Sequence, residues 1–365
     1  MGMLAYFSIP MRNKLIALAL GALLVGSFSA SACTSMIASG SATASGRPFI
    51  WKHRDTSAKN NFLYRVEPSR EGEFGYVGLF NGADSLVTDE AWMGMNDAGF
   101  AVINTVAYNL PENEPKWIDR EGFVMARALE VCRTVDDFAN LLDTLPKPLG
   151  VMTNFGVLDA DGNGAYFETG DYKYVRFNLA DAPNGVLIRT NYAYSGTPDE
   201  GMGYIRHRNV EHLLKDQIEQ GTLTPESCTE LVARSFYNDQ LGYDACTRDS
   251  RMVVDQDFVP RHSSTASIVI EGLKPGEEVD AIRMWANLGY PPCSHVVKVT
   301  LEDIPDEAGP NSDKGAYSPM GLEATERMKL VFPIRRGSGQ RYVDLDAVKK
   351  ISEQQHLQSL NEYSK

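Results

Sequence analysis

The sequence predicts an α+β fold, because segments with strand character and segments with helical periodicity alternate in blocks. Short strands joined by tight turns come first, and a helical block follows over 123–142. Strands return from 154, a second helical block covers 205–237, and strands resume at 264 before a polar helical end. With no internal repeat and no low-complexity linker, this order suits one domain of stacked layers.

Two pairs of strands in the first third are each joined by a turn. The first pair is Cys33–Ile37 and Phe49–Arg54, connected through a run rich in Gly and Ser. The second pair, Trp92–Met95 and Phe100–Val106, flanks Asn96–Gly99. An Asn-Asp-Ala-Gly sequence between two apolar runs predicts a hairpin turn that needs positive φ.

The remaining elements follow from periodicity and from start signals. Thr134, followed by Val and two Asp residues, predicts a second helix start inside 123–142. A polar loop rich in Pro and Gly covers 302–317. The further predicted strands are 154–158, 165–169, 174–178, 185–191, 264–271, 281–285 and 296–300, and the further helices are 205–219, 225–237 and most of 343–365.

Residues 1–32 are predicted to be a signal peptide, with the start of translation at Met11. A short basic segment, an apolar run over 15–28 and the small-x-small pattern of Ala30–Ala32 occur in the required order. The apolar run is shorter than the ~20 residues of a membrane span, and no other run approaches that length. We therefore expect a periplasmic or secreted protein that is cut before Cys33.

The domain prediction is a catalytic domain over 33–345 and a C-terminal helical tail over 346–365. The formal net charge is −13 at pH 7, and a leader with two basic residues and no acid would leave −15 on the mature chain. That balance argues against nucleic acid and against anionic membrane surfaces as partners. It says little about a small substrate, and it leaves a homo-oligomer open.

The cysteines and histidines predict neither a metal nor a cofactor. There is no C-x-x-C pair and no H-x-x-x-H spacing on a plausible helix. Asp159–Gly164 is similar to the start of a calcium loop but lacks the later Glu, so a plain turn is favoured. In an oxidising compartment, up to two disulfides are open to the cysteines other than Cys33. These are Cys132, Cys228, Cys246 and Cys293.

Cys33 is the strongest candidate for chemistry. As the first residue of the mature chain it would carry a thiol and a free α-amine, whose pKa is ~7.7–8.0 in model compounds. A thiol beside such a base is an activated nucleophile. One hairpin later, Asp55 can hold the α-ammonium, and Lys52 or Arg54 can keep the thiol near its thiolate form. The alternative is that these charges only end a strand.

Ala32–Ser35 followed by Trp51–Asp55 resembles the start of the choloylglycine hydrolase and penicillin V acylase family. It is still more similar to the acyl-coenzyme A:6-aminopenicillanic acid acyltransferase-like proteins. All of these are N-terminal nucleophile (Ntn) hydrolases, with a leading Cys-Thr and then Arg-Asn-x-Asp after one hairpin. Here Lys52 stands in place of the Arg, His53 in place of the Asn, and Asp55 matches the Asp.

Later segments extend the resemblance in order. Gly94–Asn104 resembles the family's Gly-Met-Asn-x-x-Gly strand pair, which ends in an oxyanion-hole Asn, here Asn104. Thr190-Asn191 resembles the Thr-Asn that places a second catalytic Asn, here Asn191. The Ser-rich strand after His262 resembles the one that precedes the last catalytic Arg of bile salt hydrolases. Ile268 stands where that Arg is found, so its role is vacant or has moved, with Arg261 as the candidate.

The resemblance implies the αββα four-layer sandwich of the Ntn hydrolases. It also implies a small-molecule amide substrate of the N-acyl amine, N-acyl amino acid or conjugated bile-acid type, cleaved through a thioester acyl-enzyme. An acyltransferase of the same fold is an alternative, and so is a non-catalytic lipoprotein lipidated on Cys33.

Four residues are candidates for substrate binding. They are Trp51, Trp92, Tyr192 and His262. Large aromatic residues at strand positions are more often part of a core, and a structural role is the alternative for the histidine. Arg206–Arg208 begins a predicted helix and is interpreted as a solvated or salt-bridged face.

Overall fold

A computed structural model of the chain describes residues 32–111 and 118–365. Within these ranges the chain clusters into one compact unit. The predicted signal peptide, except Ala32, lies outside the described residues. No helix in the described part combines the length and the hydropathy that a membrane span requires.

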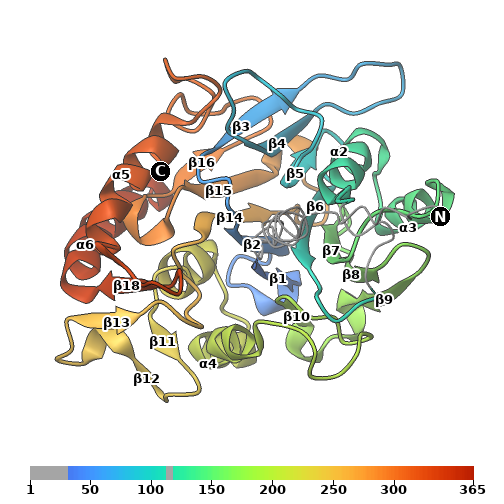
Figure 1. The fold of residues 1–365 in the computed structure, drawn as a ribbon. Helices are drawn as coiled ribbons and strands as arrows, with labels where there is room; N and C mark the ends of the chain where they lie inside the picture. The colour runs from blue at the N-terminus through green and yellow to red at the C-terminus, as the bar shows by residue number, and fades with distance from the viewer. Residues whose placement is uncertain (1–31, 112–117) are drawn as a thin grey trace, which may run out of the picture. The chain divides into compact units, whose positions relative to one another are not determined.

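Two antiparallel sheets form the centre of the unit (Figure 1). The predicted first hairpin is formed by β1 (Thr34–Ala38) and β2 (Phe49–Asp55), which lie in the six-stranded sheet. In spatial order this sheet contains β10 (Val186–Arg189), β1 (Thr34–Ala38), β2 (Phe49–Asp55), β14 (Ser264–Glu271), β15 (Arg283–Leu288) and β16 (Val297–Val299). The seven-stranded sheet contains β3 (Asn61–Val66), β4 (Tyr76–Asn81), β5 (Met93–Asn96), β6 (Ala101–Val106), β7 (Thr153–Leu158), β8 (Gly164–Thr169) and β9 (Tyr174–Asn178).

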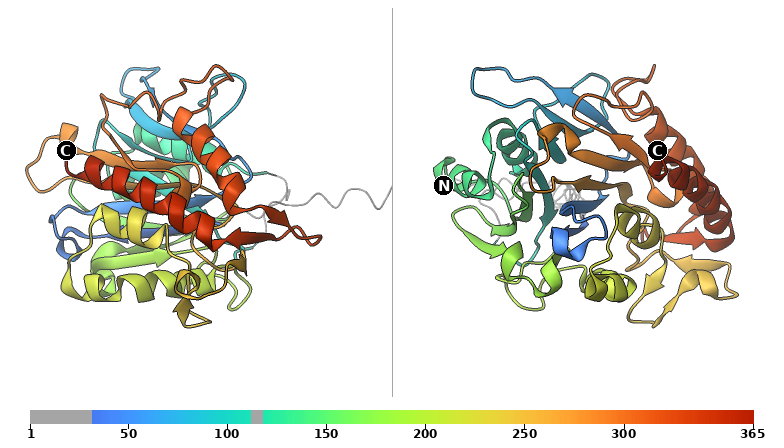
Figure 2. Two further views of the ribbon diagram at one scale, coloured as in Figure 1. Left: turned by 90° about the vertical axis from the view of Figure 1, so that its left-hand side faces the viewer. Right: turned by 180° about the vertical axis from the view of Figure 1, so that it is seen from behind.

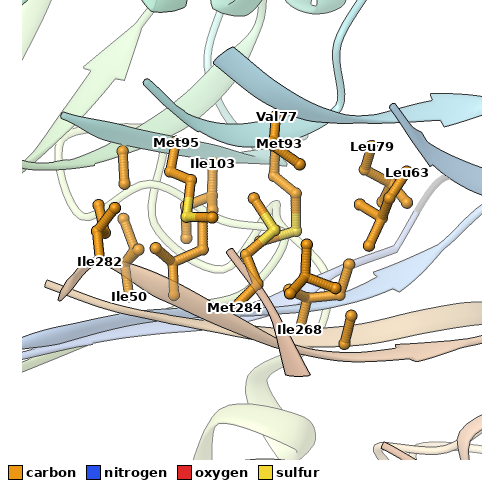
Figure 3. Close-up of a cluster of buried hydrophobic side chains, with 14 of the residues drawn as sticks. Ile50, Leu63, Val77, Leu79, Met93, Met95, Ile103, Ile268, Ile282 and Met284 are labelled. Carbon is orange, nitrogen blue, oxygen red and sulfur yellow. The ribbon is translucent and has the colours of Figure 1, made fainter. Parts of the chain in front are cut away.

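The two sheets face each other across an apolar core. Figure 3 shows Met93, Met95 and Ile103 of the seven-stranded sheet pointing toward Ile50 and Met284 of the six-stranded sheet. Burial of this shared face holds the sheets together, at about 25 cal/mol for each Å² of apolar surface removed from water.

Helices cover the outer faces of both sheets. α2 (Glu121–Val131) and α3 (Val135–Thr144) pack on the seven-stranded sheet through a second apolar cluster. α4 (Tyr204–Gln220) and the short π-helix η4 (Ser227–Val232) pack on the six-stranded sheet. The two helix layers and two sheets form the expected αββα sandwich.

The helix predicted as a tail, α6 (Leu345–Tyr363), packs on the unit from its first residue to its last. Leu345 is buried, and Ser359 accepts a hydrogen bond from the backbone N–H of Val296 at 3.0 Å. The Tyr363 ring lies 4.5 Å from that of Trp285. Figure 2 (left) shows this helix lying across the outside of the strands, next to α5 (Pro319–Val331).

Two local predictions are confirmed by hydrogen bonds. Thr134 caps α3 by accepting from the N–H of Asp137, and the Asp137 carboxylate accepts from the N–H of Thr134. In the β5–β6 turn, Gly99 has φ +78° and the Asn96 side chain accepts from the N–H of Phe100 at 3.0 Å. Both signals are local, because each motif satisfies its own backbone donors.

Other predictions need correction. The helix predicted over 225–237 is reduced to η4, and Tyr237–Asn238 instead forms β11, paired with β12 (Tyr243–Asp244). The sequence patterns did not indicate β3, β4 or α5. The interior of β4 is buried on both faces between a sheet and a helix layer, so its residues lack the polar alternation that marks a strand.

Small elements complete the description. A three-stranded sheet contains β13 (Met252–Val254), β18 (Arg341–Asp344) and β17 (Ile334–Arg335). The 3-10 turns are η1 (Gly40–Ala42), η2 (Leu179–Asp181), η3 (Pro183–Gly185), η5 (Ala245–Thr247), η6 (Val279–Ala281) and η7 (Pro291–Cys293). All five cysteines carry free thiols, so the disulfides that the sequence allows are not formed.

Candidate active site

Cys33 lies immediately before β1. The residue is 3% exposed, and its thiol donates to the backbone carbonyl oxygen of Asp55 at 3.9 Å. Along β2 the face toward the other sheet changes from Ile50 to Lys52 and Arg54. A strand that begins in an apolar core therefore ends with two cations close to the Cys33 sulfur.

Asp55, at the end of β2, is fully buried and accepts several hydrogen bonds. The Ser264 hydroxyl donates to it at 2.5 Å, and the Arg261 guanidinium forms an ion pair with it. The same guanidinium nitrogen donates to the carbonyl oxygen of Ala32 at 2.8 Å. A β-bulge between Ser264 and Ala266 interrupts the β2–β14 ladder at this point, and bulges commonly re-aim side chains beside active sites. One guanidinium thus joins the carboxylate to the peptide that precedes Cys33.

His53 supports this arrangement as a neutral side chain. Burial lowers its pKa to about 4, although Asp55 acts in the opposite direction. Its Nε2 lies 2.9 Å from the Ser264 hydroxyl oxygen. Because the single hydroxyl proton is donated to Asp55, the imidazole must be the donor to Ser264.

Lys52 reaches from β2 to the seven-stranded sheet. Its ammonium donates to the carbonyl oxygen of Trp92 at 2.8 Å and to the side-chain oxygen of Asn104 at 2.5 Å. Asn104 in turn donates to the side-chain oxygen Oε2 of Glu121, the first residue of α2. Burial lowers the pKa of Lys52 to about 8 and raises that of Glu121 to about 8.

Arg54 is held beside Lys52 by neutral partners. Its guanidinium donates to the side-chain oxygens of Asn61 and Asn81, the second at 2.9 Å. It also lies over the Trp92 ring, 4.9 Å from the centroid. Because these partners are neutral, its charge acts on the surroundings of Cys33.

Arg206, from α4, holds the other side of Cys33. It donates to the carbonyl oxygen of Cys33 at 2.7 Å, to the Thr34 hydroxyl at 2.8 Å and to the side-chain oxygen of Asn191 at 2.7 Å. Asn191 follows the end of β10 and donates to the carbonyl oxygen of Val106. The residue that the resemblance assigns to catalysis is thus linked to Cys33 through Arg206.

A family profile described as acyl-coenzyme A:6-aminopenicillanic acid acyl-transferase matches residues 57–241, slightly more than half of the chain. The chain belongs to this family. The resemblance predicted from the sequence is therefore confirmed, and the match begins two residues after Asp55. No curated protein sequence matches the chain.

Three solved structures illustrate what this chain is similar to. A Caenorhabditis elegans N-acylethanolamine-hydrolyzing acid amidase ortholog is 14% identical, covers 67% of this chain and 94% of its own, and has a TM-score of 0.42. A variant of conjugated bile acid hydrolase from Clostridium perfringens is 12% identical, with 74% and 93% coverage and a TM-score of 0.42. Penicillin V acylase from Agrobacterium tumefaciens is 14% identical, with 74% and 87% coverage and a TM-score of 0.41.

The structure brings together Cys33 and the five other residues that the sequence proposes as catalytic. Lys52, Arg54 and Asp55 lie at the end of one strand, and Asn104 and Asn191 join them through Lys52 and Arg206. Within the described ranges, no group of three or more His, Cys, Asp or Glu side chains is arranged to hold a metal ion.

The predicted substrate-binding residues are placed less uniformly. Trp92 is half-buried beside Arg54. Trp51 lies on the opposite face of β2 from Lys52, fully buried in the core under α4, because side chains alternate along a strand. Tyr192 stacks on Tyr204 with the ring centroids 4.3 Å apart.

His262 also lies outside the group around Cys33. Its ring meets that of Phe332 edge-on, 5.1 Å away, and its backbone N–H donates to Asp255. Burial and nearby cations lower its pKa to about 4. His262 therefore packs against Phe332 and not against the proposed catalytic residues. Of the four candidates for substrate binding, Trp92 is the one that contacts Lys52 and Arg54.

Sequence reasoning missed Arg206 and Glu121 as members of the site. The interpretation of Arg206–Arg208 as a solvated or salt-bridged face is wrong for Arg206, which is 1% exposed and bonds to neutral oxygens, and fits Arg208, which pairs with Asp239 at the surface. One feature of the sequence could have indicated that Arg206 points inward, because a glycine, Gly203, directly precedes the helix. Gly203 has φ +85°, and a Cβ there would lie 2.4 Å from the Arg206 guanidinium.

Proposed function

We propose that this protein is an N-terminal-cysteine amidohydrolase that cleaves a linear amide through a thioester acyl-enzyme. One observation carries the proposal: Arg261 contacts both the Ala32 carbonyl oxygen and the Asp55 carboxylate. A cut after Ala32 would leave the new α-amine of Cys33 close to Asp55. A carboxylate beside an ammonium group stabilises its charged form through a charge-assisted hydrogen bond.

The chemistry follows from that placement. The α-amine takes the thiol proton, and the Cys33 sulfur forms a bond to the amide carbonyl carbon. The tetrahedral intermediate then breaks its C–N bond, and the α-ammonium gives the proton to the departing amine. Water attacks the thioester with the same amine as base, which releases the acid and restores the thiol.

Two buried cations lie beside the proposed nucleophile in this cycle. Lys52 and Arg54 both interact electrostatically with Cys33. Positive charge held in a buried site stabilises negative charge that develops there during the reaction. Asp55, which is held in place by Ser264 and Arg261, acts as the partner of the α-amine of Cys33.

Two alternatives use the same first residue. In an acyltransferase, as in the family's name, an amine replaces water in the second half of the cycle. In a lipoprotein, Cys33 is lipidated and its amine acylated, which would prevent it from acting as a base. Ala30 is a poor match to the branched apolar residue that a lipidation signal has three positions before the cysteine.

Mass spectrometry of protein recovered from the periplasm or medium tests the proposal, together with a panel of amides assayed by amine release. We expect Cys33 as the first residue, with turnover of at least one N-acyl amine or N-acyl amino acid that is lost in Cys33→Ser. A mature chain that begins upstream of Cys33 would contradict the proposal. Labelling by a fatty acid would favour the lipoprotein, and acyl transfer to an added amine faster than hydrolysis would favour the acyltransferase.

A further inference from the structure

Lys52, Asn104 and Glu121 form a continuous hydrogen-bonded chain behind Cys33. The three side chains come from β2, β6 and the start of α2, and each residue is at most 3% exposed. Lys52 donates to Asn104, and Asn104 donates to Glu121. The Asn104 amide therefore lies between a buried cation and a buried acid.

The chemistry of the partners fixes the orientation of the Asn104 amide. An ammonium group has three donors and no acceptor, so the Asn104 atom that faces Lys52 must be the oxygen. The NH₂ group must then face Glu121, where it also lies 3.5 Å from the Thr153 hydroxyl. Strand alternation agrees, because Val102, two residues earlier, packs under α2 while Ile103 packs between the sheets.

In this orientation the amide N–H groups of Asn104 are used by Glu121 and Thr153. Lys52, by contrast, has a donor to spare. Its ammonium uses two N–H bonds, on Trp92 and Asn104, and the third has no hydrogen-bond partner in the part of the chain that the structure describes. Lys52 also interacts with the Cys33 sulfur.

We propose that Lys52, and not the Asn104 amide, is the side-chain donor to the oxyanion formed at Cys33, and that Glu121 is a positioning residue. Glu121 orients Asn104, and Asn104 holds the Lys52 ammonium in place. This inference rests on the proposed function, since it assigns roles within the same acyl-transfer site. Preorganised donors of this kind typically contribute about 10²–10³-fold to kcat.

Exchanging the amide of Asn104 with the carboxyl group of Glu121 tests whether Lys52 or Asn104 donates to the oxyanion. In the double variant Asn104→Asp with Glu121→Gln, each position keeps a side chain of the same length, but the carboxyl and the amide change places. The new carboxylate at position 104 would still accept from Lys52, and the new amide at position 121 would donate to that carboxylate. Position 104 would have no N–H left to offer to an oxyanion.

The kinetic expectations differ between the two assignments. We expect Asn104→Asp alone to lose activity, because two carboxyl groups then face each other, and the double variant to regain kcat to within about tenfold of wild type. If the Asn104 amide were the donor, the double variant would stay about 10²–10³-fold low in kcat. Lys52→Met should lower kcat by about the same 10²–10³-fold with little change in KM.

A second readout needs no substrate. The rate of Cys33 alkylation by iodoacetamide, followed against pH by mass spectrometry, reports the reactivity of the sulfur. Lys52→Met should lower the rate across this profile, because it removes a positive charge that interacts with the attacking sulfur. Glu121→Leu should lower the rate as well, and Glu121→Gln, which keeps an acceptor for Asn104, should lower it less.

Glu271→Gln is the matched control. Glu271 is equally buried but lies at the far end of β14, bonded to Arg283 and Trp285, so its replacement should leave the alkylation profile unchanged. A wild-type profile in Lys52→Met, or a double variant that does not regain activity, would overturn the inference. Failure of the proposed function would look different: Cys33 would not be the first residue, or Cys33→Ser would remain active.

Discussion

Arg206 donates a hydrogen bond of 2.7 Å to the carbonyl oxygen of Cys33, across a separation of 173 positions in the sequence. The contact exists because Gly203, three residues earlier, has no side chain to block the guanidinium. The position of the proposed nucleophile therefore depends on the first turn of α4. Variants at Gly203 and Arg206 test how strongly the position of Cys33 depends on this turn.

Gly203→Ala should destabilise the protein more than Gly242→Ala. Both glycines have positive φ, +85° and +73°, so each alanine bears the cost of the left-handed region, about 1–2 kcal/mol. At Gly203 the new Cβ would also lie 2.4 Å from the Arg206 guanidinium, whereas at Gly242 it would meet nothing within 4 Å. Overpacking adds about 1–3 kcal/mol, measurable by urea unfolding. Equal losses would show that Arg206 moves aside freely.

Arg206→Lys should lower kcat while the protein stays folded. A lysine keeps the charge, but its single ammonium lacks the planar fork that holds Cys33, Thr34 and Asn191 at once. Small displacements of a reacting group can cost about 10²-fold. Arg208→Lys, on the exposed side of the same helix, is the control and should retain wild-type kcat. Unchanged turnover in Arg206→Lys would reduce Arg206 to a structural cation.

Asp55→Asn should impair both turnover and stability. The variant leaves Arg261 without its carboxylate partner, and breaking a buried ion pair costs about 3–5 kcal/mol. It also removes the charge that would hold the α-amine. Thermal unfolding and kcat should fall together, with Asp97→Asn, in a half-exposed pair with Arg65, as the comparison. A stable Asp55→Asn protein with unchanged kcat would exclude the assigned role.

Glu121→Gln should change how stability depends on pH. Burial raises the pKa of Glu121 from 4.5 to about 8 in the folded state, so the folded protein retains a proton that the unfolded chain releases. This contribution is fully present below pH 4.5 and is lost as pH rises to about 8. The glutamine has no proton to lose, so the free energy of unfolding of the variant, relative to wild type, should rise between pH 4.5 and 8. The rise should be up to a few kcal/mol, since each pH unit between the two pKa values corresponds to about 1.4 kcal/mol. Stability curves that stay parallel over the same pH range would contradict a neutral Glu121.

The substrate prediction concerns conjugated bile acids. By the resemblance drawn from the sequence, Lys52 stands in place of an Arg and supplies a point charge instead of a planar fork. By the same resemblance, Ile268 stands where bile salt hydrolases have their last catalytic Arg. We expect weak or absent release of glycine and taurine from glycocholate and taurocholate, and faster cleavage of another N-acyl amine or dipeptide-like amide. Amine release across one panel provides the comparison. Turnover of bile-acid conjugates far above every other member would overturn this prediction.

The local part of the site could be predicted from the sequence. Cys33 directly precedes one strand of a hairpin and Lys52–Asp55 lies in the other strand. Pairing of Ser35 with Lys52 brings them together through local contacts. The turn at Asn96–Gly99 and the cap at Thr134 were equally predictable, because each motif satisfies its own backbone donors. The order of strands and helices was sufficient for the layered fold class.

Contacts between distant elements were decided by the tertiary structure alone. Arg206 resembles a solvated cation until α4 turns it inward, and Glu121 resembles an ordinary acid at a helix start until α2 brings it to Asn104. Arg261 binds Asp55 only after β14 pairs with β2. A charged residue has no periodicity that reveals its partner. Its burial depends on which face of each element the packing of the two sheets and the helices encloses.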